Sequence, residues 1–582
     1  MQSQGSPVDL YKSTEFFKLG SFDCAPRCRV KRTENLIPIL SSFNMVSIMA
    51  RLRHKFQSAK NPYISADAVN LEDFPCWSKS KKEIFEQLMF TGGFYNIYYM
   101  NETEMIRNCI KVVSAYTADN PVSAAKLAIN GRKRGFMRSL PILAVSFLSH
   151  TQNQQVKKKA FVDAFRGIII TPRDLIDFID ITRGFRGLGR MIKREINRYI
   201  KNVLKSRYAE FYAMKYKRHL SIAIKLAHPK SNNPLVDYIL NKVSIDDIDN
   251  SLYPQLYAFE EYKSKETPDI NDYVNLIERF KLEMQTLIGT HKPTERIWEA
   301  LIPQMSAMQL IKNLASLERH IGGNKLTSII KNQLSIERLN KGRVLPFRIL
   351  QAYKMLKYWK LKRILGNIAD DYAIQYDWSN LGKVCIAPDI SASMGCRIAQ
   401  RKVIGHNKYK KIRQVIPSEI AGIMTGILAL GLPDSILLPW DQVAFQLKKR
   451  NKDSVYLQVE RNRKIQKKKR KVRYSVTSIA NFIFNATGCG TFMEAPIEYL
   501  LKDQINVDTC ILITDSEEWG LGLLNTWIKY LNFVNKTANL VLIRIDPYPT
   551  NPFQPDKASD YNITQIYGWS TRVFRILENL NF

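Results

Sequence analysis

Apolar residues recur at helical spacing from about residue 71 to residue 365. Thr171-Pro172-Arg173-Asp174 is typical of a helix start, because it joins a hydroxyl cap, a proline at the first helical position and a carboxylate near the positive end of the helix dipole. Thr294 and Ser306 precede two further apolar patterns of this kind. Short amphipathic helices with brief connections over such a length predict stacked helical pairs, as in a solenoid.

The pattern changes near Trp378, where short apolar runs begin to alternate with helical stretches. The strand-like runs lie at 384–387, 435–438, 510–514 and 540–545. This alternation predicts a parallel sheet covered by helices. We therefore expect a multidomain chain with an N-terminal extension over 1–70, an all-α domain over 71–369 and an α/β domain over 370–582.

Two basic segments, 397–413 and 445–475, interrupt the predicted α/β domain. The second is too densely charged for a core element and predicts an exposed loop. Each segment could bind phosphate without choosing a sequence, or could only increase solubility.

The charge balance indicates a polyanionic partner. The chain has 582 residues, with 87 Lys and Arg against 53 Asp and Glu, and a net charge of +34. Nucleic acid is the expected partner, and an anionic membrane surface is the alternative. The apolar run from Ile420 to Pro433 is too short to span a bilayer, and the N-terminus lacks the layout of a signal peptide. We therefore expect a soluble, cytoplasmic protein without a membrane partner.

Positive charge is densest between Arg183 and Lys230, where few acidic residues interleave. Basic residues recur there at three- to four-residue multiples, which predicts that they share one helix face: Arg186, Arg190, Arg194 and Lys201. Arginine forks suit phosphate oxygens, and histidine or tyrosine rings can stack on unpaired bases. A solvated helix face is the alternative interpretation. The candidate RNA-binding residues are Arg186, Arg190, Lys193, Arg194, Lys215, Lys217, Arg218, His219, Lys225 and His228.

A second candidate site follows the first predicted strand. Asp389, Ser391 and Ser393 alternate directly after 384–387, and ligands of open α/β sheets bind beyond the carboxyl ends of the strands. Several oxygen donors with few charges suit Mg²⁺, although serine and aspartate also crowd ordinary turns. The candidate ligands of this divalent cation are Asp389, Ser391, Ser393, Thr491 and Asp515.

The order of these motifs resembles the TROVE family of Ro-type RNA-binding proteins. Within it, Asp-x-Ser-x-Ser, Gly-x-Gly-Thr and Thr-Asp resemble the metal-ion-dependent adhesion site of von Willebrand factor A domains. The motifs that carry the family resemblance are Phe90-Thr91-Gly92-Gly93 with Tyr98-Tyr99, Gly187-Leu188-Gly189-Arg190, Lys215-Tyr216-Lys217-Arg218, Lys225-Leu226-Ala227-His228, Leu345-Pro346-Phe347-Arg348-Ile349-Leu350, Asp389-Ile390-Ser391-Ala392-Ser393-Met394 and Thr514-Asp515.

The resemblance implies a HEAT-like helical-repeat ring joined to a von Willebrand factor A-type, Rossmann-like α/β domain. It implies that a small structured RNA (a Y RNA) binds the outer basic surface, where Lys215, Arg218 and His228 match contact positions. It also implies that single-stranded 3′ ends of misfolded RNA enter the ring, in RNA quality control or a ribonucleoprotein scaffold. An exoribonuclease or another RNA-processing protein is then an expected partner of the A domain, and the ring is expected to be monomeric.

This chain departs from the family in two places. The connection between Lys215-Tyr216-Lys217 and the motif ending at His228 is short, so either Arg218 or His219 fills the basic position. The basic segments 397–413 and 445–475 are insertions that typical members lack.

Two other classes of function stay open. A metal-dependent adhesion adaptor would capture an acidic partner through the A domain. A nuclease would use Asp389, Asp515 and Glu517, yet two-metal hydrolysis needs a richer carboxylate cluster than this hydroxyl-rich pattern predicts. We therefore expect a protein that is not an enzyme.

Overall fold

The computed structural model divides the chain into two units, Met1–Ser65 and Ala66–Phe582, and all described residues belong to the second. The predicted extension and both basic segments therefore lie wholly or largely outside the described residues, as do Tyr98 and Tyr99. The described residues are 66–580, with gaps at 72–73, 94–99, 151–154, 230–231, 266–268, 288, 332, 396–399, 404–408, 413–415, 452–453, 458–471, 487, 489 and 520–521.

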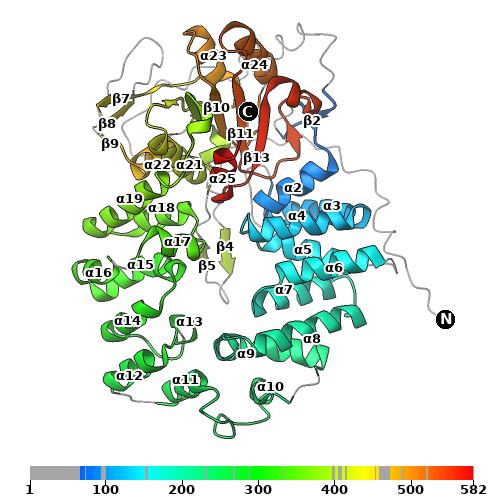
Figure 1. Ribbon diagram of the computed structural model, residues 1–582, viewed down its shortest axis with the longest axis vertical. Coiled ribbons are helices and arrows are strands. Elements are labelled where there is room, and N and C mark those ends of the chain that lie inside the picture. Colours follow the sequence, from blue (N-terminus) through cyan, green and yellow to red (C-terminus); the bar gives the residue numbers. More distant parts are fainter. Residues whose placement is uncertain are drawn as a thin grey trace, which may run out of the picture. The chain divides into compact units, whose positions relative to one another are not determined.

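The first helices of this unit stack as pairs (Figure 1). Helices two positions apart contact one another, so that α2, α4 and α6 form one row and α3, α5, α7 and α9 form a second. This is the packing of a solenoid, as the helical period predicts. The helices are α2 (Lys81–Thr91), α3 (Glu102–Asp119), α4 (Pro121–Lys133), α5 (Ser139–Leu148), α6 (Gln155–Ile168), α7 (Pro172–Arg183), α8 (Arg190–Leu204) and α9 (Ala209–Ala227).

The helical row continues through shorter helices that curve back toward the α/β part (Figure 1). Contacts run from α9 to α11, then through α12, α14 and α15 to α18 and α19. These helices are α10 (Pro234–Ile239), α11 (Pro254–Ser264), α12 (Ile270–Phe280), α13 (Met284–Leu287), α14 (Glu295–Leu301), α15 (Ala307–Ile321), α16 (Gly323–Ile330), α17 (Ile336–Lys341), α18 (Pro346–Met355) and α19 (Trp359–Ala373), with a 3₁₀ turn at Ile302–Gln304.

The predicted helix starts are present. Thr171 caps α7 in a reciprocal arrangement, because its side chain accepts from the Asp174 backbone N–H while Asp174 accepts from Thr171. Ser306 and Gln309 form the same arrangement at α15. Thr294 is the residue before α14, and it forms no side-chain cap bond there.

The predicted parallel sheet has five strands in the order β13-β11-β10-β3-β6. Four of them overlap the predicted runs, and β13 is a strand that the sequence pattern did not predict. Buried apolar side chains fill β3, β10 and β11, as expected of a sheet covered on both faces. The strands are β3 (Val384–Pro388), β6 (Ile436–Leu437), β10 (Thr509–Thr514), β11 (Asn539–Arg544) and β13 (Ile563–Tyr567).

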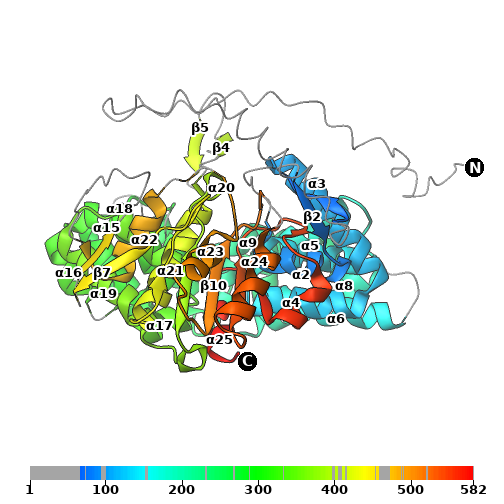
Figure 2. The same cartoon turned by 90° about the horizontal axis from the view of Figure 1, so that it is seen from above.

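The crossover connections from β3 and from β10 lead to opposite sides of the sheet. After β3 the chain passes through α21 (Pro417–Gly431) to β6 on one side, and after β10 it passes through α24 (Gly522–Phe533) to β11 on the other. Right-handed crossovers that run in opposite directions place α21 and α24 on opposite faces of the sheet (Figure 2). The carboxyl ends of β3 and β10 therefore border the crevice in which open α/β folds bind ligands. The remaining helices of this part are α20 (Ala392–Gly395), α22 (Val476–Asn485), α23 (Ala495–Lys502) and α25 (Arg572–Glu578).

The described residues of the two basic segments form strands. β4 (Gln400–Val403) and β5 (Tyr409–Ile412) make a separate antiparallel pair. β7 (Leu447–Asn451), β8 (Ser454–Leu457) and β9 (Val472–Arg473) extend the sheet from β6 in antiparallel order. The prediction of a loop over 445–475 is wrong for these strands, because antiparallel strands pair through their backbones and can keep charged side chains on a solvated face.

The α/β part contacts both ends of the helical row and closes it. Ser570 donates to the backbone carbonyl of Arg134 at the end of α4, at 3.0 Å. Trp569 stands edge-on to Phe347 of α18, with ring centroids 5.1 Å apart. We call residues 568–580 the clasp, because they contact both ends. A small sheet of β1 (Ala68–Val69), β2 (Pro75–Ser78) and β12 (Thr550–Asn551) adds a second junction.

Within the described part of the chain, no helix combines the length and the apolar character needed to cross a bilayer.

Candidate functional site

The carboxyl ends of β3 and β10 bring several predicted ligands together. The Thr514 hydroxyl donates to Asp389 Oδ2 at 2.6 Å, and the Ser391 backbone N–H donates to Asp389 Oδ1 at 2.8 Å. The Ser391 and Ser393 hydroxyl oxygens are 3.1 Å apart. Asp389 and Asp515 are both fully buried. Parallel pairing of β3 with β10 places these polar side chains at one sheet edge, as predicted.

The glycine-rich loop that carries Thr491 lies against the same edge. The Gly488 backbone N–H donates to the Ile390 carbonyl at 2.7 Å, and a Cβ at Gly488 would lie 2.6 Å from a carboxylate oxygen of Asp441. Only glycine permits this approach. Thr491 is buried, and its backbone carbonyl accepts from the Trp519 N–H at 2.8 Å.

This edge concentrates buried negative charge. Burial raises the pKa of Asp389 to about 8, and repulsion from Asp515 adds to the shift. Burial likewise raises the pKa of Glu517 to about 8. The pKa of Asp546 is raised by burial and by the charges of Asp515 and Glu517. Like charges that share a buried site destabilise one another.

The donor set fits a hard divalent cation. A cation among Asp389, Ser391, Ser393 and Asp515 would offset the cost of burying two carboxylates, and hydroxyl and carboxylate oxygens are the ligands that Mg²⁺ takes. Among the described residues there is no group of three or more His, Cys, Asp and Glu side chains arranged to hold a metal. The candidate ligand set combines the hydroxyls of Ser391, Ser393 and Thr491 with two carboxylates, those of Asp389 and Asp515.

Sequence reasoning missed Thr514 as a partner of Asp389, and it missed the buried carboxylates of Asp441 and Asp546. The signal for Asp546 was its place two residues after β11, at the same edge of the sheet. Asp441 lies four residues after β6, and only the folded backbone brings it to the loop at Gly488.

The predicted RNA-binding residues lie on α8, on α9 and in the loop between α7 and α8. Arg186 lies in that loop and not on a helix face, because α8 begins at Arg190. Its guanidinium donates to the carbonyl of Ser149. Arg186 and Lys193 border one hollow together with Leu226 near the end of α9. His228 follows α9 in a left-handed conformation with φ of 52° and is exposed.

The basic side chains of α9 point in different directions. The helix is kinked at Tyr216, where φ is −118° and ψ is 23°. Before the kink, Lys215 borders a hollow shared with α15 and α17, and burial lowers its pKa. After it, the Lys217 ammonium lies 3.5 Å from the centre of the Tyr238 ring on α10. Arg218 is exposed, whereas His219 contacts the Arg173 guanidinium of α7 at 3.2 Å.

None of the ten candidate residues lies within ion-pairing distance of a carboxylate in the part of the chain that the structure describes. Neighbouring arginines behave differently. Arg132 and Arg138 pair with Asp174, and Arg166 and Arg198 pair with Glu195. Among the described residues, the candidate residues therefore differ from these arginines in that none of them forms an ion pair.

A row of aromatic rings lies along α9 beside the candidate RNA-binding residues. The rings of Tyr208, Tyr212 and Tyr216 follow one another with centroids 6.0 and 6.1 Å apart, and His219 continues the row at 5.7 Å. The Lys215 ammonium lies 5.0 Å from the centre of the Tyr216 ring. Aromatic rings beside basic groups are the elements of single-strand binding surfaces.

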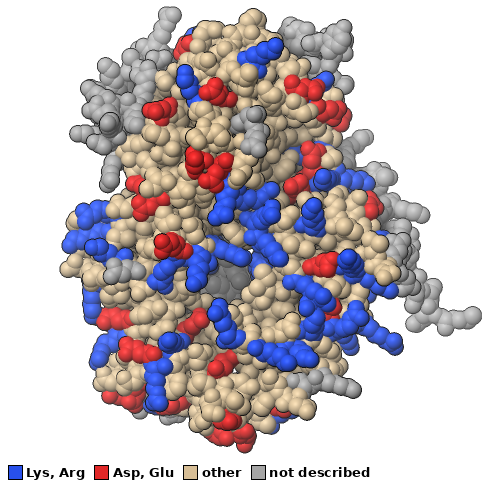
Figure 3. Space-filling model, viewed as in Figure 1, with Lys and Arg blue, Asp and Glu red and all other residues tan. Residues whose placement is uncertain are grey.

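Figure 3 shows how charge is distributed over one face of the molecule. Lys and Arg side chains gather around the hollow at its centre, and Asp and Glu lie mostly toward the upper and lower edges. The ring therefore presents a positive inner rim on this face.

Comparison with known proteins agrees with this architecture. Residues 279–401 match the TROVE domain. The chain is 20% identical over 410 residues to the RNA-binding protein RO60 of Deinococcus radiodurans, a match that covers 65% of this chain and 69% of that protein. The crystal structure of the Deinococcus radiodurans RO (RSR) protein matches with a TM-score of 0.57 at 16% identity, over 86% of this chain and 99% of that one. The predicted family resemblance is confirmed, as is the predicted fold of a helical ring with a von Willebrand factor A-type domain.

Proposed function

We propose that this chain, whose TROVE-type architecture is established above, binds small structured non-coding RNA on its basic helical surface and receives single-stranded 3′ ends at the central hollow. In this role it acts in RNA quality control or as a ribonucleoprotein scaffold. The protein similar to it is named as RNA-binding, which supports the general class of partner. The kind of RNA and the use of the hollow are our proposal.

One observation carries the proposal: cations that form no ion pair among the described residues, Lys215 for one, adjoin an aromatic row on α9, in a chain whose net charge is +34. Solvated helix faces usually interleave acids with bases, and here the acids pair with other arginines. Phosphates would neutralise the free cations, and unpaired bases would stack on the tyrosines. Such a surface recognises charge and exposed bases rather than sequence.

We also propose that the A-domain site holds Mg²⁺ through Asp389, Ser391, Ser393, Thr491 and Asp515. The buried carboxylates that repel one another support this proposal, because a cation would stabilise them. When bound, such an ion would supply Lewis-acid chemistry. The five residues would hold it, while the Thr514 hydroxyl and the Ser391 backbone N–H fix the carboxylate of Asp389.

Substitution of three basic positions tests the RNA interface. The variant is Lys215→Ala, Arg218→Ala and His228→Asn, the last because Asn tolerates the left-handed backbone at this position. We expect its affinity for a small structured RNA to fall at least tenfold at moderate salt. The slope of log affinity against log salt should fall by about two, one for each cation lost.

The control removes exposed cations that are already paired, through Lys81→Ala, Lys325→Ala and Lys557→Ala. This control removes at least as much positive charge, so an equal loss of affinity in both variants would indicate a general charge effect. Unchanged affinity in the test variant would refute the proposed interface.

A further inference from the structure

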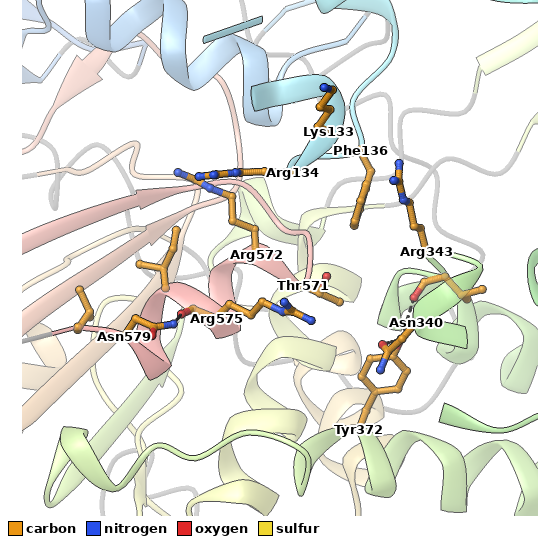
Figure 4. A pocket seen from close by; sticks show the side chains of 13 residues that line it. Lys133, Arg134, Phe136, Asn340, Arg343, Tyr372, Thr571, Arg572, Arg575 and Asn579 are labelled. Carbon is orange, nitrogen blue, oxygen red and sulfur yellow. Dashed lines mark hydrogen bonds between the residues drawn. The ribbon is translucent and has the colours of Figure 1, made fainter. Parts of the chain in front are cut away.

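A cavity of about 750 Å³ lies where α4, the turn after α17 and the clasp meet. Figure 4 shows its lining from close by. Five cations border it, two from the end of α4, one from the turn after α17 and two from α25: Lys133, Arg134, Arg343, Arg572 and Arg575. No residue of the predicted RNA interface takes part, so this is a separate site. Its volume falls within the range of small-molecule pockets.

Among the described residues, no ion pair offsets the positive charge of this cavity. No Asp or Glu lines it, and within the described residues none of the five cations forms an ion pair. Figure 4 shows the guanidinium groups of Arg134 and Arg572 beside each other. Burial lowers the pKa of Arg572, Glu86 opposes this shift, and the charge of Arg134 lowers the pKa further. Like charges held together at a cavity wall are costly without an anion between them.

The opposite wall offers an aromatic ring. Phe136 is half-buried, and the guanidinium of Arg343 lies 5.6 Å from its centroid. Both residues have a left-handed backbone, with φ of 59° and 50°. Bulky side chains rarely adopt this conformation, and such strain gathers at ligand sites. Two polar side chains, Tyr372 and Asn340, complete the wall. The Tyr372 hydroxyl donates to Asn340 Oδ1 at 3.1 Å.

We propose that this cavity binds a nucleoside phosphate, with the phosphate between Arg134, Arg572 and Arg575 and the base against Phe136. Guanidinium forks match phosphate oxygens in geometry and charge. An aromatic face beside an arginine is a platform for a base. This nucleoside phosphate has two possible sources. One is a terminal nucleotide of bound RNA, and for that source the proposal rests on the proposed function. The other source is a free nucleotide, which requires no RNA.

The position of the cavity gives the ligand a structural effect. Its walls come from the beginning of the helical row, from the end of that row and from the clasp. A ligand that contacts all three stabilises the closed ring, because binding to the folded state alone raises its stability. Occupation should therefore raise the midpoint of thermal unfolding as nucleotide concentration increases.

Isothermal titration calorimetry of the full chain tests this inference. The probes are AMP, inorganic phosphate, and a trinucleotide with and without a terminal phosphate. We expect AMP or the phosphorylated trinucleotide to bind, with affinity at least tenfold lower in the double variant Arg134→Ala and Arg575→Ala. Arg363→Ala, on an exposed arginine of α19, is the control and should leave binding unchanged.

The outcomes separate the possibilities. Binding of AMP identifies a free nucleotide as ligand, and binding of the phosphorylated trinucleotide alone identifies an RNA end. Inorganic phosphate that binds as tightly as AMP would overturn the role of Phe136. Failure of every probe at millimolar concentration, or equal binding by the double variant, would overturn the proposal.

Binding of structured RNA, measured in parallel, keeps the two proposals distinct. We expect the double variant to retain it, since neither arginine belongs to the α7–α9 surface. Wild-type protein that binds AMP but no structured RNA would refute the proposed function and leave the nucleotide site standing.

Discussion

The charged side chains of the helical part divide into residues with an internal partner and residues without one. Asp174 belongs to the first kind. It is fully buried, its oxygens accept from Arg132 at 3.0 Å and from Arg138, and it caps α7. Burial alone would raise its pKa, yet Arg132, the Thr171 backbone and Arg138 together lower it. The carboxylate thus stabilises the fold in its charged form.

Asp174→Asn should lower the free energy of unfolding by about 2 kcal/mol at pH 7. Loss of one partner of a buried pair typically costs more, and the partial exposure of Arg138 reduces the figure. Because the pKa is lowered in the folded state, the stabilisation is present above the ordinary value of 3.8 and is lost as pH falls through the lower folded value. Denaturant unfolding at several pH values measures both effects.

Asp180→Asn, on an exposed side chain of the same helix, is the control and should change stability little. A stability difference between wild type and Asp174→Asn that already shrinks between pH 7 and pH 5 would contradict this account.

At the scale of elements, α9 combines two surfaces in one helix. The kink at Tyr216 turns its two halves, so that Lys215 borders the hollow near α15 while Lys217 lies against α10. The aromatic row of Tyr208, Tyr212 and Tyr216 reaches this kink, and His219 continues it on the other side. In a regular helix, the angle between the side chains of Lys215 and Lys217 would be fixed. Because the helix is kinked between them, each lysine faces a different neighbouring element.

Tyr208→Ala should weaken binding of an unstructured oligoribonucleotide by about tenfold, the typical effect of losing one stacked base. Tyr208 is exposed and begins the row, so its loss should leave the fold intact. Fluorescence anisotropy with a labelled oligouridylate provides the measurement.

The matched control is Tyr257→Ala on α11, where the hydroxyl donates to Asp246 at 3.2 Å and the acid repels phosphate. Equal losses in both variants would remove the aromatic row from the binding surface.

The sequence predicted elements where local chemistry decides them. The cap at Thr171, the helix starting after Ser306 and the buried strands β3 and β10 were all predictable, because capping and apolar runs act within a few residues. β13 was missed, since its sequence Ile-Thr-Gln-Ile-Tyr neither alternates apolar with polar residues nor forms a continuous apolar run. The same patterns were enough to place Asp389 and Asp515 at one sheet edge.

The cavity at the clasp could not be predicted. Its cations come from segments near 134, 343 and 572, which no local pattern connects. The assignment of Arg186 to a helix face was wrong for a similar reason, because its spacing to Arg190 resembles a helix turn although Gly189 precedes α8 as its cap. Folding alone decides which distant charges meet.

At the scale of the whole molecule, the proposed metal site and the proposed RNA surface belong to different parts. The proposed ligands follow β3 and β10, whereas the proposed RNA contacts lie on α7–α9. Their separation distinguishes an RNA-binding protein from an adhesion adaptor, since only the latter would need the metal for its main activity.

Chelation with EDTA, and separately Asp389→Asn, should leave affinity for structured RNA within about twofold of wild type. The same treatments should abolish Mg²⁺ binding measured by calorimetry, because each removes the ion or a charged ligand. Asp560→Asn, on an exposed residue remote from the sheet edge, is the control.

Loss of RNA binding on chelation would favour a metal-dependent interface and contradict this division. Equal Mg²⁺ binding by Asp389→Asn would count against the proposed ligand set.

The junctions of the ring also bear on the order of folding. Neighbouring helices contact one another at short sequence separation, but the side chain of Asn70 reaches the Glu518 carbonyl over 448 positions and Lys79 reaches the Tyr548 carbonyl over 469. Contacts of such long separation are slow to form because of the chain entropy that they cost. The helical pairs should therefore assemble first as an open arc. An RNA present during folding would meet that arc before its gap has shut.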